Sequence, residues 1–320
     1  MPNNFRYHKL ILSLACTILP FNVQAELSHK QIITNANLTE VANTIQLKSN
    51  EKPLPSSKVL TSNSKQSTNF LIKLGCLPTE ETKLSNQSSL AEDCPALKPL
   101  TIDYPVVPAS LTSVLNQLLE DKVFEGYNIK EQEVVTSSES GKNIILYGHS
   151  SLPHAKQLIT LLKINNIDFT WQLIAKSSAF NIREDWQDTQ PEEQVETIRT
   201  GKEYDVRFTF ADKAEQQRFM PLINQFAKKD SGNETGLIID AWWQPFYRTF
   251  YSQESFVAVK RVSLQVDGFV GSTLVLPSDL NKVLKQINTT LLETNTKVAV
   301  SSEDVWVNPA FYRYLNGGYK

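Results

Sequence analysis

Apolar residues that recur every three or four positions predict four helices in the central and C-terminal parts of the chain. They begin near Ser110, Pro153, Asp212 and Ser278, at residues that suit helix starts. Their expected buried positions are Leu111, Val114, Leu115, Leu118 and Leu119 in the first helix, Ala155, Leu158, Ile159, Leu161 and Leu162 in the second, Phe219, Leu222, Ile223 and Phe226 in the third, and Leu280, Val283, Leu284 and Ile287 in the fourth.

Between these helices, short apolar or alternating segments predict strands. The clearest cover residues 144–147, 167–174, 204–210, 261–266 and 270–276, and Asp267-Gly268 predicts a hairpin turn between the last two. The first two strands flank the helix that opens at Pro153. We therefore expect a β-α-β unit whose two strands are parallel and lie next or nearly next to each other.

The first 25 residues have the pattern of a secretory signal peptide. Arg6 and Lys9 precede an apolar stretch at 10–21, and Val23-Gln24-Ala25 provides a small-residue cleavage site. The apolar stretch is shorter than the roughly 20 residues of a membrane-spanning helix, so we expect no transmembrane span in the mature chain. Lipoprotein processing at Cys16 is the alternative. The mature protein is expected to be periplasmic or secreted.

The remaining cysteines, Cys76 and Cys94, predict a structural disulfide. The expected export would take this pair into an oxidising compartment, where disulfides form and persist. A redox or metal-binding pair is the alternative. Residues 26–69 are rich in Ser, Asn, Thr, Lys and Gln and predict a flexible leader, with a short helix at 38–47 as the alternative. The disulfide and several prolines make 70–108 a stapled connector, and 109–320 is the expected folded domain.

Charge and histidine content exclude several functions. The chain has 32 Lys+Arg against 34 Asp+Glu, so no strong basic field attracts nucleic acid, and we expect no nucleic-acid partner. There are 4 histidines and none follows His154. Glycine-rich phosphate loops are lacking, and His149 with His154 falls short of a zinc-binding set. We therefore expect neither a metal nor a cofactor.

Two segments of the chain resemble the thioredoxin and glutaredoxin family. In residues 143–171 a strand ending at Tyr147 leads through a short loop into a helix, and Leu152-Pro153-His154-Ala155 stands where the family has Cys-Pro-x-Cys. Residues 261–287 resemble the closing hairpin and last helix. The resemblance implies an α/β fold, a thioredoxin-like mixed sheet flanked by helices with a large insertion at about 183–253, and a site without redox cysteines.

The resemblance also implies a groove at the former redox site. The chain has no proline between Pro245 and Pro277, so Val262 takes the position of the family's cis-proline. The groove would then be lined by residues of the strand-loop-helix segment together with that valine: His149, Ser150, Leu152, His154 and Val262.

An aromatic block at 242–251 is the second candidate binding feature. Because successive strand residues face opposite sides, Trp242 and Trp243 cannot both point into one core face. Aromatic residues beside an arginine are common interface anchors, so Trp242, Trp243, Tyr247 and Arg248 join the candidate binding residues. Burial of the block on both sides of a sheet is the alternative.

These features predict a non-catalytic, redox-inactive envelope protein that binds a peptide or protein partner. A role as an accessory of a secretion or conjugation apparatus fits this prediction. The alternative is a hydrolase that uses Ser150 as nucleophile, because Gly148-His149-Ser150 lies between a strand and a helix. That alternative lacks the glycine expected at Leu152 and the later histidine of a triad. No catalytic residue is predicted.

Overall fold

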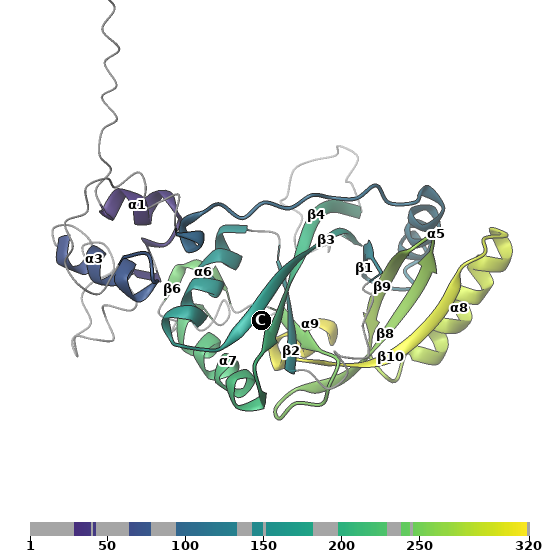
Figure 1. The fold of residues 1–320 in the computed structure, drawn as a ribbon. Helices are drawn as coiled ribbons and strands as arrows, with labels where there is room; N and C mark the ends of the chain where they lie inside the picture. The colour runs from purple at the N-terminus through teal and green to yellow at the C-terminus, as the bar shows by residue number, and fades with distance from the viewer. Residues whose placement is uncertain are drawn as a thin grey trace, which may run out of the picture.

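The protein, seen here in a computed structural model, is built around a closed barrel of eight antiparallel strands. The structure describes residues 29–39, 41–42, 64–77, 94–132, 143–149, 152–181, 198–228, 238–243 and 246–318 (Figure 1). The predicted signal peptide lies outside these ranges. Around the barrel the strands follow the order β1 (Gly126–Glu131), β3 (Phe169–Asn181), β4 (Ile198–Phe210), β2 (Asn143–His149), β7 (Phe246–Thr249), β10 (Ala299–Val307), β8 (Val257–Val266) and β9 (Phe269–Val275).

Several helices lie around the barrel. They are α1 (His29–Asn35), α3 (Ser64–Lys73), η1 (Pro95–Leu97), α5 (Ala109–Glu120), α6 (Leu152–Ile164), α7 (Lys213–Phe226), α8 (Leu280–Glu293) and α9 (Pro309–Leu315). A separate two-stranded parallel sheet joins β5 (Ala227–Lys228) to β6 (Ile238–Trp243). None of these described helices has the length and apolar character needed to cross a membrane.

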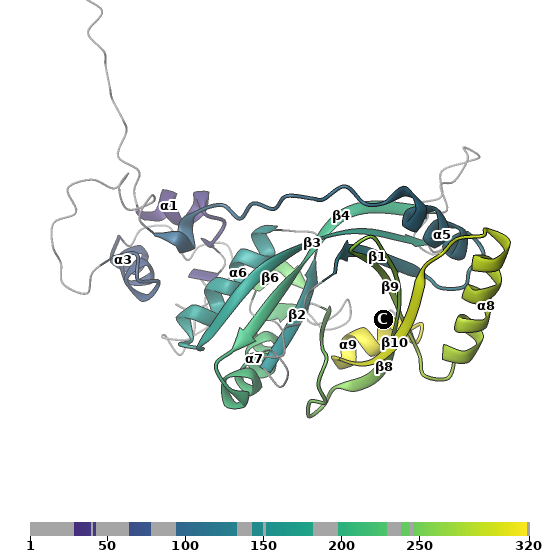
Figure 2. The same cartoon turned by 45° about the vertical axis from the view of Figure 1, so that its right-hand side comes forward.

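The helices cover the outside of the barrel in two groups. Helices α6 and α7 lie over the strands β2, β3 and β4, whereas α5 and α8 cover the half that contains β1, β8 and β9 (Figures 1 and 2). Each group buries its own apolar cluster against the outer strand face. Helix α9 lies instead on the inner side, next to β7 and β8 (Figure 2).

The four helices expected from apolar spacing are all present. Every predicted buried position of the first three is buried, and in α8 Val283 and Ile287 are. The third helix begins near Asp212 as predicted, and the Asp212 side chain caps α7 by accepting a hydrogen bond from the Glu215 amide. The first helix differs at its start, where Pro108 and not Ser110 occupies the cap position.

The thioredoxin-like fold predicted from the resemblance is wrong. Strands β2 and β3 do run parallel across α6, but β4 lies between them and pairs antiparallel with both. The predicted insertion at 183–253 therefore supplies β4, α7 and β7, which are integral to the barrel. The description of the protein as glutaredoxin-like and redox-inactive is wrong for the same reason. It assumed the mixed sheet of the thioredoxin fold, whereas the structure has a closed antiparallel barrel.

The second resembling segment also has a different place. Strands β8 and β9 form the predicted hairpin, and both turn residues, Asp267 and Gly268, have positive φ values of 47° and 79°, which suit a tight hairpin turn. The hairpin does not close a sheet edge, however. Strand β8 pairs further with β10 along nine residue pairs, and β9 pairs with β1. The local elements are correct and their long-range partners are not.

Part of the segment 26–69, predicted as a flexible leader, is helical. Helices α1 and α3 contribute Ile32, Ile33, Phe70 and Leu71 to the same apolar cluster as α6. Single aliphatic residues too sparse to form their own core are thus buried against the barrel's helices. The disulfide expected between Cys76 and Cys94 is present, with Cα atoms 5.0 Å apart.

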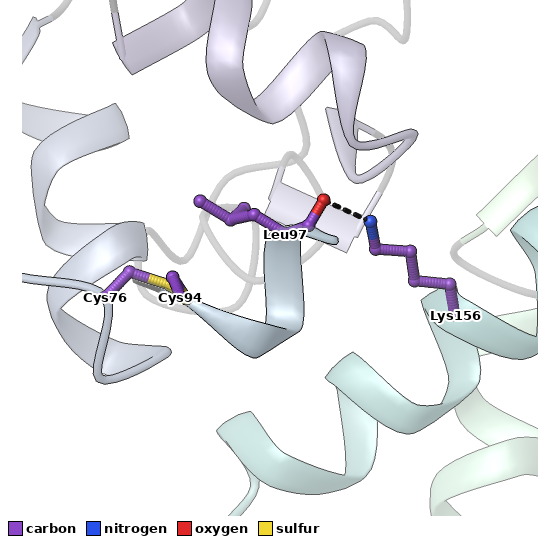
Figure 3. Close-up of a disulfide and its surroundings, with 4 residues drawn as sticks. All are labelled: Cys76, Cys94, Leu97 and Lys156. Carbon is purple, nitrogen blue, oxygen red and sulfur yellow. Dashed lines mark hydrogen bonds between the residues drawn. A yellow bond between two sulfur atoms is a disulfide. The ribbon is translucent and has the colours of Figure 1, made fainter. Parts of the chain in front are cut away.

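Lys156 of α6 joins the barrel to the disulfide segment. Its ammonium donates a hydrogen bond of 2.8 Å to the Leu97 carbonyl, three residues beyond Cys94 (Figure 3). Gln157 adds a bond of 3.2 Å to the Asn37 carbonyl. Burial lowers the pKa of Lys156 to about 8. The hydrogen bond therefore connects α6 to the disulfide segment, but it requires the Lys156 ammonium to lose part of its hydration.

This depressed pKa predicts a pH dependence of stability. Between pH values of about 8 and 10.5 the unfolded chain holds more protons at Lys156 than the folded chain does, so the free energy of unfolding rises with pH. The free energy of unfolding of the wild type should rise by on the order of 1 kcal/mol per pH unit more than that of Lys156→Met, which lacks the titrating group. Urea unfolding at pH 7.5 to 10.5 measures it. Lys163→Met, at an exposed position of the same helix, should retain the wild-type slope; parallel curves for wild type and Lys156→Met would contradict the assignment.

Candidate functional site

The strand register divides the barrel side chains into an outer and an inner set. Asp205 of β4 is paired with Gly148 of β2 and Ile174 of β3, and paired residues of neighbouring strands face the same side. Following such pairs around all eight strands returns to the same face without a break. Since the opposite face packs under the helices, Asp205 faces the barrel interior.

The centre of the inner face is a buried ion cluster around Asp205. The carboxylate is fully buried and accepts a hydrogen bond of 3.1 Å from the Lys176 ammonium of β3. Its second oxygen accepts one of 2.5 Å from the Arg248 guanidinium of β7. Both cations are themselves buried. Three strands that do not all neighbour one another are thereby joined by one carboxylate.

The surrounding cations decide the ionisation of Asp205. Burial alone would raise its pKa, but the positive charges of Arg248, Lys176 and Lys130 outweigh that effect. The pKa of the carboxyl is consequently held well below its usual value. Glu203, whose carboxylate lies 3.6 Å from the Lys176 ammonium, continues the cluster toward solvent and accepts a hydrogen bond of 2.8 Å from Ser178.

Gly148 makes room for this cluster. A Cβ atom at position 148 would lie 2.9 Å from the nearer Asp205 oxygen, 3.0 Å from the Lys176 nitrogen and 3.7 Å from the Arg248 guanidinium. The strand β2 lies between the strands that carry Asp205 and Arg248. A side chain on β2 at this point would therefore separate the guanidinium from the carboxylate.

Beside the ion cluster, one level of the inner face carries only small polar side chains over five strands. The paired residues are, in strand order from β3 through β1, β9 and β8 to β10, Ser178, Asn128, Ser272, Ser263 and Ser301. Ser272 donates a long hydrogen bond of 3.4 Å to the Asn128 side chain. We call these five residues the polar rung.

The other part of the inner face is apolar and is covered by α9. Val259, Val305 and Val307 form a small buried cluster with residues of that helix. Phe246 of β7 stacks on Phe311 of α9 with ring centroids 5.1 Å apart. The barrel interior thus has an apolar side closed by α9 and a polar side formed by the rung and the ion cluster.

The described residues of the predicted groove and of the aromatic block lie on different faces of the barrel. Val262 is buried on the outer face under α5 and α8, whereas Tyr247 is buried on the outer face beside α7. Arg248 faces inward and belongs to the Asp205 cluster. Leu152 and His154 are partly buried at the start of α6, and burial lowers the pKa of His154. The side chains of His149, Trp242 and Trp243, and the residues Ser150 and Ser151, lie outside the described part of the structure.

Sequence reasoning identified Arg248 but missed Asp205, Lys176 and Lys130. The signal was present in β4, where Asp205 and Arg207 alternate with Tyr204 and Val206. Charged residues at every second position normally mark a solvent-facing side. Only barrel closure turns that side inward. In the described ranges no group of three or more His, Cys, Asp and Glu residues is arranged to hold a metal ion.

The cluster predicts unequal effects for two aspartate substitutions. Asp205→Asn leaves buried cations without their carboxylate and should lower the free energy of unfolding by about 3–5 kcal/mol. Asp304→Asn removes the partner of Lys260 in a partly exposed ion pair of 2.7 Å and should cost about 1 kcal/mol or less. Chemical denaturation of both variants tests this. Equal losses would show that the interior cluster contributes no more than a surface pair.

Comparisons with known proteins offer no relative whose function could be considered for this chain. No family model and no curated protein matches the sequence, and no solved structure matches the protein. Function is therefore inferred from the barrel itself, from its charges and from the strand edges that it leaves open.

Proposed function

We propose that the mature chain is an exported, non-catalytic protein that binds an extended segment of a protein partner in the cell envelope. The binding site is the edge of β3, and the segment adds to it as a further strand. The observation that carries the proposal is the unequal pairing of β3 on its two sides.

Strand β3 is paired along its whole length with β4 on one side, from Phe169 to Asn181. On the other side β1 pairs only with residues 177–180. Within the ranges that the structure describes, no strand pairs with residues 169–176 on that second side. This half of β3 therefore presents backbone donors and acceptors beyond the part that pairs with the short strand β1 (Figure 2).

Most of the open edge lacks the usual protection against strand addition. Natural edges carry lysine, proline or other charged residues that discourage pairing; here Lys176 lies at one end of the open stretch, and the other residues, 169–175, read Phe-Thr-Trp-Gln-Leu-Ile-Ala. Trp171 is 36% exposed, and Thr170 and Gln172 beside it are exposed. An exposed tryptophan next to unpaired backbone groups suits a peptide that gains affinity from main-chain bonds and a side-chain anchor.

The proposed location rests on features outside the barrel strands. Residues 1–25 have the charge, apolar stretch and small-residue end of a secretory signal. The Cys76–Cys94 disulfide is a bond typical of oxidising compartments. A role as an accessory of a secretion or conjugation apparatus in the cell envelope is consistent with a peptide-binding protein of this compartment.

Site-specific crosslinking in cells of the native host tests the proposal. A photoreactive benzoylphenylalanine at position 172 should give an adduct with a partner protein, whereas the same group at Leu292, an exposed position of α8, should give none. Adding Trp171→Ala should reduce the adduct at 172 about tenfold, because loss of an anchoring tryptophan costs about 1–2 kcal/mol or more.

Two results would count against strand addition at β3. One is crosslinking at 292 as strong as at 172, and the other is an adduct at 172 that Trp171→Ala leaves unchanged. Stoichiometric labelling of Ser150 by a fluorophosphonate would instead favour the hydrolase alternative. Export itself is tested by the size and location of the mature chain after cell fractionation.

A further inference from the structure

We propose that two copies of this chain pair through the open edges of their β3 strands, and that this dimer covers the edge until a partner segment displaces it. The two strands run antiparallel about a two-fold axis, and residues 169–175 of each copy form the contact. The inference rests on the proposed function, because it describes how access to the same strand edge is regulated.

The first argument is the direction of the backbone groups of β3. In an antiparallel ladder the N–H and C=O of one residue point to the same neighbouring strand, and successive residues alternate between the two sides. The Asp168 carbonyl accepts a hydrogen bond from the Ala211 amide on the β4 side, whereas the Asn181 amide donates one to the Glu125 carbonyl on the β1 side. Even-numbered residues therefore bond to β4. The residues of the open stretch whose backbone groups point to the open edge are Phe169, Trp171, Leu173 and Ala175.

The second argument is that one register of two β3 strands uses all of these groups. It places Gln172 opposite Gln172 of the second copy, so that Trp171 lies opposite Leu173 and Phe169 lies opposite Ala175. Each of these odd-numbered pairs can exchange two backbone hydrogen bonds. A slide by two residues leaves Phe169 or Ala175 opposite a residue outside the open stretch, and a slide by one residue sets outward side chains against inward ones.

The third argument is the fit of the outward side chains. Trp171 is 36% exposed, whereas Phe208, its paired neighbour on β4, is 0% exposed. The apolar outer row is therefore completely covered on β4 and incompletely covered on β3. In the proposed register a large side chain meets a smaller one at each position, Trp171 beside Leu173 and Phe169 beside Ala175. A second copy thus extends the apolar row with residues of complementary size.

The fourth argument is charge. Residues 169–175 carry no charged side chain, so the two paired strands do not repel each other. Continuing the same register places Asp168 of each copy opposite Lys176 of the other, which brings opposite charges together at both ends. Lys176 keeps its hydrogen bond to Asp205, so this end pair adds attraction without requiring the buried cluster to rearrange.

Such a dimer would protect the edge and yet release it. An isologous contact occupies the same backbone groups in both copies, and a partner segment needs those groups, so the two occupants exclude each other. Two strands of this length bury less surface than a standard stable interface. The dimer should therefore dissociate on dilution and give way to a segment that binds more tightly.

Oxidative crosslinking of the purified mature chain, with its Cys76–Cys94 disulfide intact, tests the register. Gln172→Cys places two sulfurs at a pair that is not hydrogen-bonded, with Cα atoms about 4.5 Å apart, which suits a disulfide. Equivalent Cα atoms of Thr170→Cys would lie roughly 13 Å apart. Both residues are exposed and on the same face of β3. With oxidised glutathione, Gln172→Cys should form a covalent dimer about tenfold faster or more; equal rates would overturn the proposal.

Sedimentation equilibrium provides a second test without an added cysteine. The wild type should show a monomer–dimer equilibrium that depends on concentration. Ala175→Pro removes an N–H that points to the open edge and keeps the bonds to β4, so it should weaken the dimer about tenfold or more while the barrel stays folded. A wild type that is monomeric at every concentration, or a proline variant that dimerises equally well, would overturn the proposal.

The outcomes for the dimer and for the partner segment can be told apart. The two tests above use one purified protein, so their failure leaves a partner adduct at position 172 in cells unaffected. A dimer that forms in the predicted register without any partner adduct in cells would instead contradict the proposed function alone.

Discussion

The ionised Asp205 carboxylate is the constraint on which the barrel interior depends. It bonds to Lys176 of β3 and Arg248 of β7, and β2 passes between the strands that carry the aspartate and the arginine. Removing three charged groups from water is unfavourable unless their geometry is complementary. The registers of β3, β4 and β7 are therefore coupled, because a shift of any one by a single residue would turn its charged side chain toward the helices. Gly148 is part of the same constraint.

The barrel wall has an outer face and an inner face of different character. On the outside, helices bury the apolar strand face in two clusters. On the inside, α9 covers the apolar side, and the polar rung and the Asp205 cluster form the polar side. The edge of β3 is open because β1 has only six residues and pairs with residues 177–180 of β3 alone. The shortness of β1 thus leaves the proposed peptide edge beside the closed barrel.

Local structure could be predicted from the sequence, and tertiary pairing could not. The helix of residues 152–164 follows from apolar spacing, the Asp267-Gly268 turn from its residue types, and the disulfide from an even pair of cysteines behind a predicted signal peptide. A strand followed by a helix and another strand is common to thioredoxin-like sheets and to this barrel. What distinguishes them is that β4 pairs with both β2 and β3, which is a contact between distant segments. The spacing of apolar residues within one segment does not indicate which distant strand that segment will pair with.

The candidate site was missed for the same reason. Asp205 lies on a strand whose alternation was visible, but alternation does not tell whether the polar side faces solvent or a barrel interior. Val262 illustrates the opposite error, because a position inferred from family resemblance proved to be core beneath α5 and α8. Charged residues on alternate positions of long strands deserve consideration as interior groups whenever the strand count permits closure.

The ionisation of Asp205 is the most direct measure of the central claim. Carbon-13 NMR of its side-chain carboxyl, assigned by comparison with Asp205→Asn, reports the pKa in the folded protein. The account predicts that the carboxyl titrates well below the usual value of about 3.9, because Arg248, Lys176 and Lys130 lower its pKa. Titration at or above that value would contradict it, because the carboxylate would then lack the cations that the barrel interior places around it.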